Sequence, residues 1–187
     1  NGKPVLLADQ DEPLAAWVKR WFEVTSELKM DIGDFHTGHY LDRYPSNHLS
    51  DRDKDVMEWI IDNAHWYDGL EVVEGAQEGI AQLEEYFDIW ICTKPSDANP
   101  SCMQAKLDWI KKYFPSLRKK MIPTHNKAMV RGEILLDDAP ELDQIPHALW
   151  KPVVFSCPFN GSHSEWAALP HFRWGDDIQI LLDQIEF

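Results

Sequence analysis

The chain has 187 residues, and its 18 lysines and arginines stand against 32 aspartates and glutamates, which gives a formal net charge of −14. That length suits one domain of roughly 100–200 residues with room for a small insertion. A hydrophobic content of 44% excludes a disordered chain, because such chains bury too little apolar surface to fold. The acidity argues against a nucleic-acid polymer as partner, since its phosphates require a basic face. An anionic small molecule would need a metal ion or a nearby lysine in its site.

The three cysteines, Cys92, Cys102 and Cys157, form no Cys-x-x-Cys pair. We therefore expect neither a disulfide framework nor a zinc site. Reduced thiols are typical of a cytoplasmic protein, which is the location that we predict. The sequence contains no apolar stretch near the roughly 18 residues that a transmembrane helix requires, so no membrane partner is expected.

The first predicted element is a short apolar strand over residues 4–8, which ends abruptly at Asp9 and Asp11. A continuous apolar run that stops at acids is typical of a buried parallel strand whose carboxyl end reaches a sheet edge. Apolar residues then recur at helical spacing and predict an amphipathic helix over about residues 13–28. Pro13 suits the first turn of that helix, where its missing N–H is not needed.

Helical and buried-strand patterns alternate along the rest of the chain. The predicted elements are a loop over residues 30–50, helices over 50–60, 74–87, 103–114 and 176–185, and strands over 87–93, 121–123, 134–136 and 153–155. Strands that alternate with helices indicate an α/β fold with a mostly parallel sheet.

Residues capable of chemistry follow three of the predicted strands: Asp9 and Asp11, Thr93 and Lys94, and Asp137 and Asp138. In open α/β sheets, ligands bind outside the carboxyl ends of the strands. The alternative is that these acids only mark where strands reach solvent. Clustered carboxylates repel one another unless a hard cation neutralises them, and Mg²⁺ prefers such oxygen ligands together with water and phosphate. Lys106 or Lys127 would complete a phosphoryl-binding site, although a lysine is more often a solvated surface residue.

These residues carry a resemblance to a known superfamily. Asp9-x-Asp11, Thr93, a later lysine and the pair Asp137-Asp138 resemble the haloacid dehalogenase (HAD) superfamily of phosphohydrolases. More narrowly, residues 91–95, 106–114 and 135–140 are similar to the 5'(3')-deoxyribonucleotidase family, whereas residues 30–66 align only loosely. The resemblance implies a HAD-like Rossmannoid three-layer core with a parallel sheet over residues 1–29 and 67–187. A small helical cap over residues 30–66 would be inserted after the first helix.

The resemblance also implies an activity and a role for each site residue. The protein would be a Mg²⁺-dependent phosphomonoesterase that hydrolyses deoxyribonucleoside monophosphates through an aspartyl-phosphate. Asp9 would be the nucleophile, and Asp11 the general acid and then the general base. The metal would be held by Asp9, the backbone carbonyl of Asp11, and Asp138, with Asp137 in support. The phosphate-binding candidates are Thr93, Lys94, Lys106 and Lys127.

In that family an aromatic pocket holds the base of the nucleotide. Trp17 aligns with the aromatic residue of the first helix, and His39 and Tyr40 align with the cap loop. For Trp21 and Trp66 we expect ordinary core packing instead. The implied partner is a small nucleotide, and a homodimer is compatible with the resemblance.

Two departures from the family keep alternatives open. Glu12-Pro13 replaces the usual Gly-Val, and Lys94 stands where a small hydroxyl residue often follows the threonine. Pro13 removes an N–H where the chain leaves the strand, and Lys94 could contact phosphate or point to solvent. The alternatives are a phosphatase for another small phosphomonoester, a catalytically weak nucleotide-binding protein, and a phosphoacceptor receiver domain.

Overall fold

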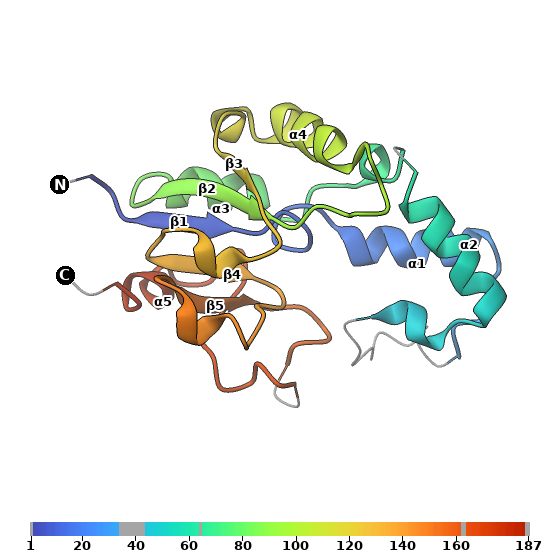
Figure 1. The fold of residues 1–187 in the computed structure, drawn as a ribbon. Coiled ribbons are helices and arrows are strands. Elements are labelled where there is room, and N and C mark those ends of the chain that lie inside the picture. The colour runs from blue at the N-terminus through green and yellow to red at the C-terminus, as the bar shows by residue number, and fades with distance from the viewer. Residues whose placement is uncertain (1, 34–43, 64, 162–163, 186–187) are drawn as a thin grey trace.

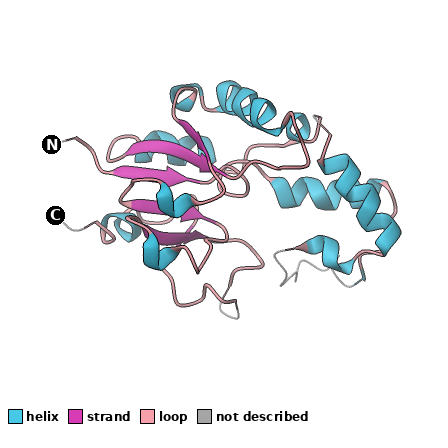
Figure 2. Ribbon diagram, viewed as in Figure 1, coloured by secondary structure: helices cyan, strands magenta, loops and turns pink. Residues whose placement is uncertain are grey.

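The computed structural model describes residues 2–33, 44–63, 65–161 and 164–185. Their centre is a six-stranded sheet with the order β3-β2-β1-β4-β5-β6, in which every neighbouring pair is parallel (Figure 2). The strands are β1 (Val5–Ala8), β2 (Asp88–Thr93), β3 (Met121–Pro123), β4 (Ile134–Asp137), β5 (Lys151–Phe155) and β6 (His171–Phe172). The predicted α/β class with a parallel sheet is thus confirmed. β6 escaped prediction because two residues are too few to show a periodicity.

Helices lie in the connections between the strands from β1 to β5, and Figure 1 shows α1 and α2 beyond the carboxyl ends of the strands, away from the sheet. The α-helices are α1 (Trp17–Glu27), α2 (Asp51–Ile61), α3 (Ala76–Leu83), α4 (Cys102–Tyr113) and α5 (Gln179–Leu182). Short 3₁₀ helices are η2 (Pro45–His48), η3 (Tyr67–Gly69), η4 (Pro115–Leu117), η5 (Lys127–Met129) and η6 (Ile145–His147). Among the described residues, no helix is both long and apolar enough to span a membrane.

The start of α1 differs from the prediction. The helix begins at Trp17, so the expectation that Pro13 lies in its first turn was wrong. Residues 10–16 instead form a tight loop, in which the Gln10 carbonyl accepts the N–H groups of both Leu14 and Ala15. The backbone of Glu12 is left-handed there, with φ of 70°. The apolar spacing of residues 14–28 concealed this loop, because Leu14 packs in the core without being helical.

The two faces of the sheet are covered differently. Leu6 and Ala8 point into a large core that includes residues from α3 and α4, whereas Leu7 and Leu135 point into a smaller cluster with Trp150. Alternate residues of a strand point to opposite faces, so both faces are buried. The smaller cluster is covered by residues of and near η5 and η6 rather than by α-helices. A sheet buried on both faces gives the strand ends a fixed position.

Candidate active site

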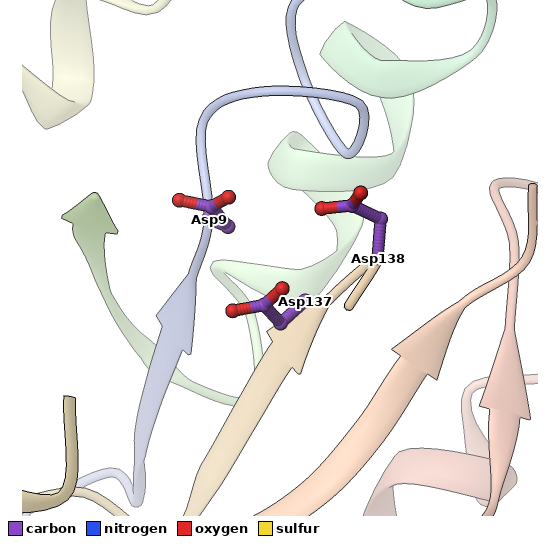
Figure 3. A group of neighbouring side chains, drawn as sticks. All are labelled: Asp9, Asp137 and Asp138. Carbon is purple, nitrogen blue, oxygen red and sulfur yellow. The ribbon is translucent and has the colours of Figure 1, made fainter. Parts of the chain in front are cut away.

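Carboxylates meet at the ends of the central strands β1 and β4 (Figure 3). Asp9 follows β1, Asp137 ends β4 and Asp138 follows it, and one oxygen of each lies within 4.8 Å of the others. The Asp9 N–H donates to the Leu136 carbonyl at 2.9 Å, which extends the β1–β4 ladder to the level of the site. The chain continues from β1 to one side and from β4 to the other, so the cluster lies at the topological switch point of the sheet.

Lys127 lies beside two of these carboxylates. Its Nζ donates to Asp137 Oδ2 at 2.6 Å and lies 3.0 Å from Asp9 Oδ1. Burial alone would lower the pKa of Lys127, but the two aspartates raise it above its ordinary range, so the ammonium group stays charged. The Trp150 indole donates to the Lys127 carbonyl at 2.9 Å and anchors η5 to the sheet.

One lysine does not neutralise three clustered carboxylates. Burial is the largest cause that raises the pKa of Asp9, and it also raises that of Asp138 well above the ordinary value, with Asp137 adding to both effects. Asp9 Oδ1 is buried without a hydrogen-bond donor of suitable geometry. A group of hard oxygen ligands with excess negative charge fits a divalent cation such as Mg²⁺.

The two adjacent aspartates differ in how far their oxygens are engaged. Asp137 Oδ2 accepts from Lys127, and Asp137 Oδ1 accepts from the Ala139 N–H at 2.9 Å. Within the described part of the chain, the Asp138 carboxylate has no such donor. Asp138 and Asp9 are therefore the carboxylates most available to a cation, and Asp137 is the one that holds Lys127.

Asp11 belongs to a second polar network, centred on Lys106 of α4. The Lys106 ammonium lies 2.8 Å from Asp11 Oδ2, 2.7 Å from Thr93 Oγ1 and 3.1 Å from the Lys94 carbonyl. This lysine side chain is only 1% exposed, so its charge is compensated inside the protein rather than by water. The Asp11 carboxylate is not in the three-aspartate cluster, and only the predicted backbone contact would bring Asp11 to the metal. Lys106, which the resemblance places among the phosphate-binding candidates, is central to this network.

Lys94 occupies the rim of the site. Its side chain is 58% exposed, and its ammonium lies 3.9 Å from Glu141 Oε1. It lines a small cavity of about 70 Å³ that also touches Asp9, Lys127 and Asp138. A contact between Lys94 and phosphate stays a prediction.

The residues predicted for the nucleoside pocket are only partly described. His39 and Tyr40 lie outside the described residues. Trp17 is half-buried, and its ring centroid is 5.4 Å from that of Trp66 at an angle of 60°. Trp66 is buried and Trp21 fully so, which confirms the prediction of core packing for both.

Tyr67 was not predicted as a site residue. Its ring centroid lies 5.3 Å from Lys106 Nζ, directly beside the second network. Burial, followed by the charge of Asp11, raises the pKa of Tyr67, so its phenol stays neutral. The residue belongs to the 3₁₀ helix η3, which is too short for a periodic signal.

A larger hollow of about 610 Å³ lies on the other side of Glu12. Its walls include Lys19, Phe155 and Trp174, but none of the three clustered aspartates. Because no carboxylate of the cluster faces it, this hollow is not part of the candidate active site.

The comparison with protein families covers almost the whole chain. Residues 3–182 match the model of the family described as 5' nucleotidase, deoxy (pyrimidine), cytosolic type C protein. The chain belongs to this 5'-nucleotidase family. The resemblance inferred from the motifs is therefore confirmed, and the motifs lie at the carboxyl ends of β1, β2 and β4, as expected.

Named relatives are consistent with this membership. The human mitochondrial 5'(3')-deoxyribonucleotidase is 28% identical over 138 residues, which cover 70% of this chain and 59% of that protein. The human cytosolic-type 5'(3')-deoxyribonucleotidase is 27% identical over 123 residues, covering 61% of this chain and 59% of that protein. A Bordetella bronchiseptica protein, whose 5'(3')-deoxyribonucleotidase name is provisional, is 24% identical over 91% of this chain and 92% of its own length. The matches thus span about three fifths of the human proteins and nearly all of the bacterial one.

Solved structures support the fold. A haloacid dehalogenase-like family protein from Streptococcus pneumoniae superposes with a TM-score of 0.57 at 10% identity and covers 97% of this chain and 98% of that one. A Bacillus subtilis HAD-hydrolase structure bound to magnesium gives 0.57 at 11% identity, over 98% and 100% of the two chains. The chain therefore has the fold of HAD phosphohydrolases.

Proposed function

We propose that this 5'-nucleotidase family member is a Mg²⁺-dependent phosphomonoesterase that hydrolyses deoxyribonucleoside monophosphates. The observation that carries the proposal is the meeting of Asp9, Asp137 and Asp138 beside Lys127 at the switch point of the sheet. The names of the human relatives support the substrate class. The magnesium in the B. subtilis structure supports the metal.

The proposed metal site uses residues that the structure brings together. Asp9 and Asp138 would hold Mg²⁺ through their carboxylates, with the backbone carbonyl of Asp11 as a further ligand. Asp137 would support them by holding Lys127 at 2.6 Å. When bound, the cation would neutralise the carboxylates and the incoming phosphate, so that the negative groups can approach one another.

The proposed reaction has two steps, each with one nucleophile. In the first, an Asp9 carboxylate oxygen attacks phosphorus, the bond from phosphorus to the nucleoside oxygen breaks, and Asp11 gives that oxygen its proton. In the second, Asp11 takes a proton from water, the water oxygen attacks phosphorus, and the bond between phosphorus and Asp9 breaks. Inorganic phosphate leaves, and both aspartates return to their starting states.

The two lysines have separate tasks in this scheme. Lys127, which lies 3.0 Å from Asp9 Oδ1, would offset the charge that gathers on the transferring phosphoryl group. Lys106 would hold Asp11 and Thr93 at a fixed separation, because it contacts both at 2.8 Å and 2.7 Å. Thr93 and, at the rim, Lys94 would contact the phosphate oxygens.

Substrate choice would come from the side of the site that faces α1 and α2. We propose that Trp17 stacks against the base, and that residues 30–66 act as a cap over a core of residues 1–29 and 67–187. Figure 1 supports this division, since α2 lies apart from the sheet. Stacking on an aromatic ring contributes about 1–3 kcal/mol per base in proteins that bind single strands.

The test is phosphate release from dUMP, dTMP, UMP and simple sugar phosphates, with Mg²⁺ and with EDTA. We expect turnover of the deoxynucleotides that requires Mg²⁺ and is lost in Asp9→Asn, whose fold is checked by circular dichroism. Asp108→Asn is the matched control, because Asp108 is an exposed aspartate that pairs with side chains on α4, Gln104 and Lys111. Equal turnover of dUMP and UMP would contradict the deoxynucleotide preference. Activity in Asp9→Asn would contradict the assignment of Asp9 as the nucleophile.

A further inference from the structure

The segment that follows β5 holds the loop that carries Asp138. Asn160 lies in this segment and is fully buried. Its Nδ2 donates to the Asp138 carbonyl at 2.8 Å and to the Phe155 carbonyl at 2.7 Å. Its Oδ1 accepts from the Cys157 N–H at 2.8 Å. Both donors and the acceptor of this amide therefore bind main-chain groups, which fixes the Asp138 backbone to the end of β5.

We propose that Asn160 is a positioning residue that orients the Asp138 carboxylate for a divalent cation. The proposal rests on the proposed function, because it assumes that Asp138 is a metal ligand. Asp137 is oriented through its own side chain, by Lys127 and the Ala139 N–H. Asp138 has no comparable side-chain donor among the described residues, so the direction of its carboxylate depends on where its backbone is held.

Removing Asn160 would free the backbone of Asp138 at the point where the ligand is attached. The Asp138 carbonyl would lose its donor, which favours a shift of the loop toward another partner or water. Outer-shell groups that orient metal ligands typically change metal affinity about 10–100-fold when they are removed. The effect of Asn160 should therefore appear in metal affinity and not only in stability.

A matched control exists in the same segment. The Trp166 indole donates to the Pro140 carbonyl at 2.9 Å, two residues beyond Asp138, and its ring packs against Phe159. Trp166→Phe removes this donor and keeps an aromatic ring. It loosens the same loop without touching the Asp138 backbone, so it separates general loosening from the specific role of Asn160.

The experiment measures Mn²⁺ binding to the purified full chain by electron paramagnetic resonance, without substrate. We expect Asn160→Ala to raise the Mn²⁺ dissociation constant about 10-fold or more, and Trp166→Phe to change it by less than about twofold. Asn160→Asp is the second variant, because it keeps the acceptor for Cys157 but loses the donor to Asp138. Its added negative charge would tighten cation binding by electrostatics alone, so weaker binding of Mn²⁺ would point to positioning. Circular dichroism and thermal melting check the fold of each variant.

Two results would overturn the inference. One is an unchanged Mn²⁺ dissociation constant in folded Asn160→Ala, and the other is an equal loss of affinity in Trp166→Phe. Absence of Mn²⁺ binding in the wild-type chain would contradict the proposed function as well. Binding in the wild type together with unchanged binding in folded Asn160→Ala would overturn this inference alone.

Discussion

The carboxyl edge of the sheet and the segment of residues 44–63 are held in place by different means. At the sheet edge, Lys127 contacts Asp137 and Asp9 at 2.6 Å and 3.0 Å, on strands buried on both faces. Residues 44–63 pack against the main core through Met57, Leu49, Ile60 and Ile61, and they accept hydrogen bonds from a side chain outside the segment, that of Asn99. The Asn99 amide donates to the Ile61 and Asn63 carbonyls at the longer distances of 3.4 Å and 3.2 Å.

The exposed surface of α2 extends this contrast. Trp59 is 70% exposed and Val56 38% exposed, whereas the side chains of the strand residues next to Asp9 are fully buried. The aspartates that we propose for phosphoryl transfer thus lie at the ends of well-packed strands, and reactions of this kind depend on accurate positioning. The segment that we propose to cover the substrate is attached by side-chain packing and by longer hydrogen bonds, outside the parallel sheet, which suits a part that opens and closes.

The largest expected effect on stability comes from removing the positive charge of Lys127 at the sheet edge. Lys127→Met leaves Asp137 and Asp9 buried without their lysine, and loss of one partner of a buried ion pair costs about 3–5 kcal/mol. We expect the free energy of unfolding in EDTA, measured by urea denaturation, to fall by that amount. Saturating Mg²⁺ should restore part of it, because in the proposed site the cation would neutralise the same carboxylates.

Lys111→Met is the control for this variant. Lys111 is half-exposed and pairs with Asp108 on the surface of α4, where water screens the pair, so its loss should leave the free energy of unfolding nearly unchanged. If Lys127→Met were as stable in EDTA as Lys111→Met, the description of the sheet edge as an excess of buried negative charge would be wrong.

The next effect concerns recognition rather than stability. Trp17→Ala should raise KM for dUMP about 10-fold, since the loss of base stacking costs about 1–3 kcal/mol. It should leave kcat/KM for a sugar phosphate without a base nearly unchanged. Trp21→Ala is the contrasting variant, because Trp21 is fully buried in the same helix and its truncation should cost about 3–5 kcal/mol of stability. An equal rise in KM for both substrates in Trp17→Ala would contradict a contact with the base.

A smaller effect tests the attachment of α2. Asn99→Ala removes the two long hydrogen bonds to the end of α2, which together contribute about 1–2 kcal/mol. It also removes the bond that the Ser101 N–H donates to Asn99 Oδ1 at 3.0 Å, just before α4. Amide hydrogen exchange measured by mass spectrometry should become several-fold faster at the carboxyl end of α2 and stay unchanged in β1 and β4. Ser50→Ala is the matched variant, because it removes the N-cap at the other end of the same helix. Unchanged exchange at the end of α2 in Asn99→Ala would mean that Met57 and its neighbours hold the segment alone.

The same contrast explains how much could be predicted from the sequence. Continuous apolar runs made β2 and β4 recognisable, and the acids that follow the strands predicted which residues meet. The meeting of Asp9 with Asp138 follows from topology, because parallel strands bring their carboxyl ends to one edge. The fold and the centre of the site could therefore be predicted because both depend on regular strands.

Other contacts had no signal in the sequence. The bond between Lys106 and Asp11 joins residues 95 positions apart, and Asn160 reaches Asp138 across 22 positions from an irregular segment. No periodicity marks residues in such segments, so neither their partners nor the loop of residues 10–16 could be derived from spacing. Glu12 at φ of 70° shows the same limit, since a left-handed glutamate is uncommon and no local rule predicts it.

The smallest expected effect lies at the opposite end of the sheet from the site, where Asp88 of β2 accepts from Lys120 at 2.8 Å and from the Trp90 indole at 3.1 Å. Lys120 first, and then Trp90, lowers the pKa of Asp88 below its ordinary value.

The pair is partly exposed, so at pH 7 Asp88→Asn should lose only about 0.2–1 kcal/mol of stability. A depressed folded-state pKa stabilises the protein above the unfolded pKa of about 4 and loses that contribution as the pH falls below it. The difference in the free energy of unfolding between wild type and Asp88→Asn, measured by urea denaturation, should therefore shrink between about pH 5 and pH 3. Asp88 becomes protonated over this range. A difference that grew toward low pH would show that the carboxylate is not the stabilising form, and that this end of the sheet depends on the surrounding apolar packing instead.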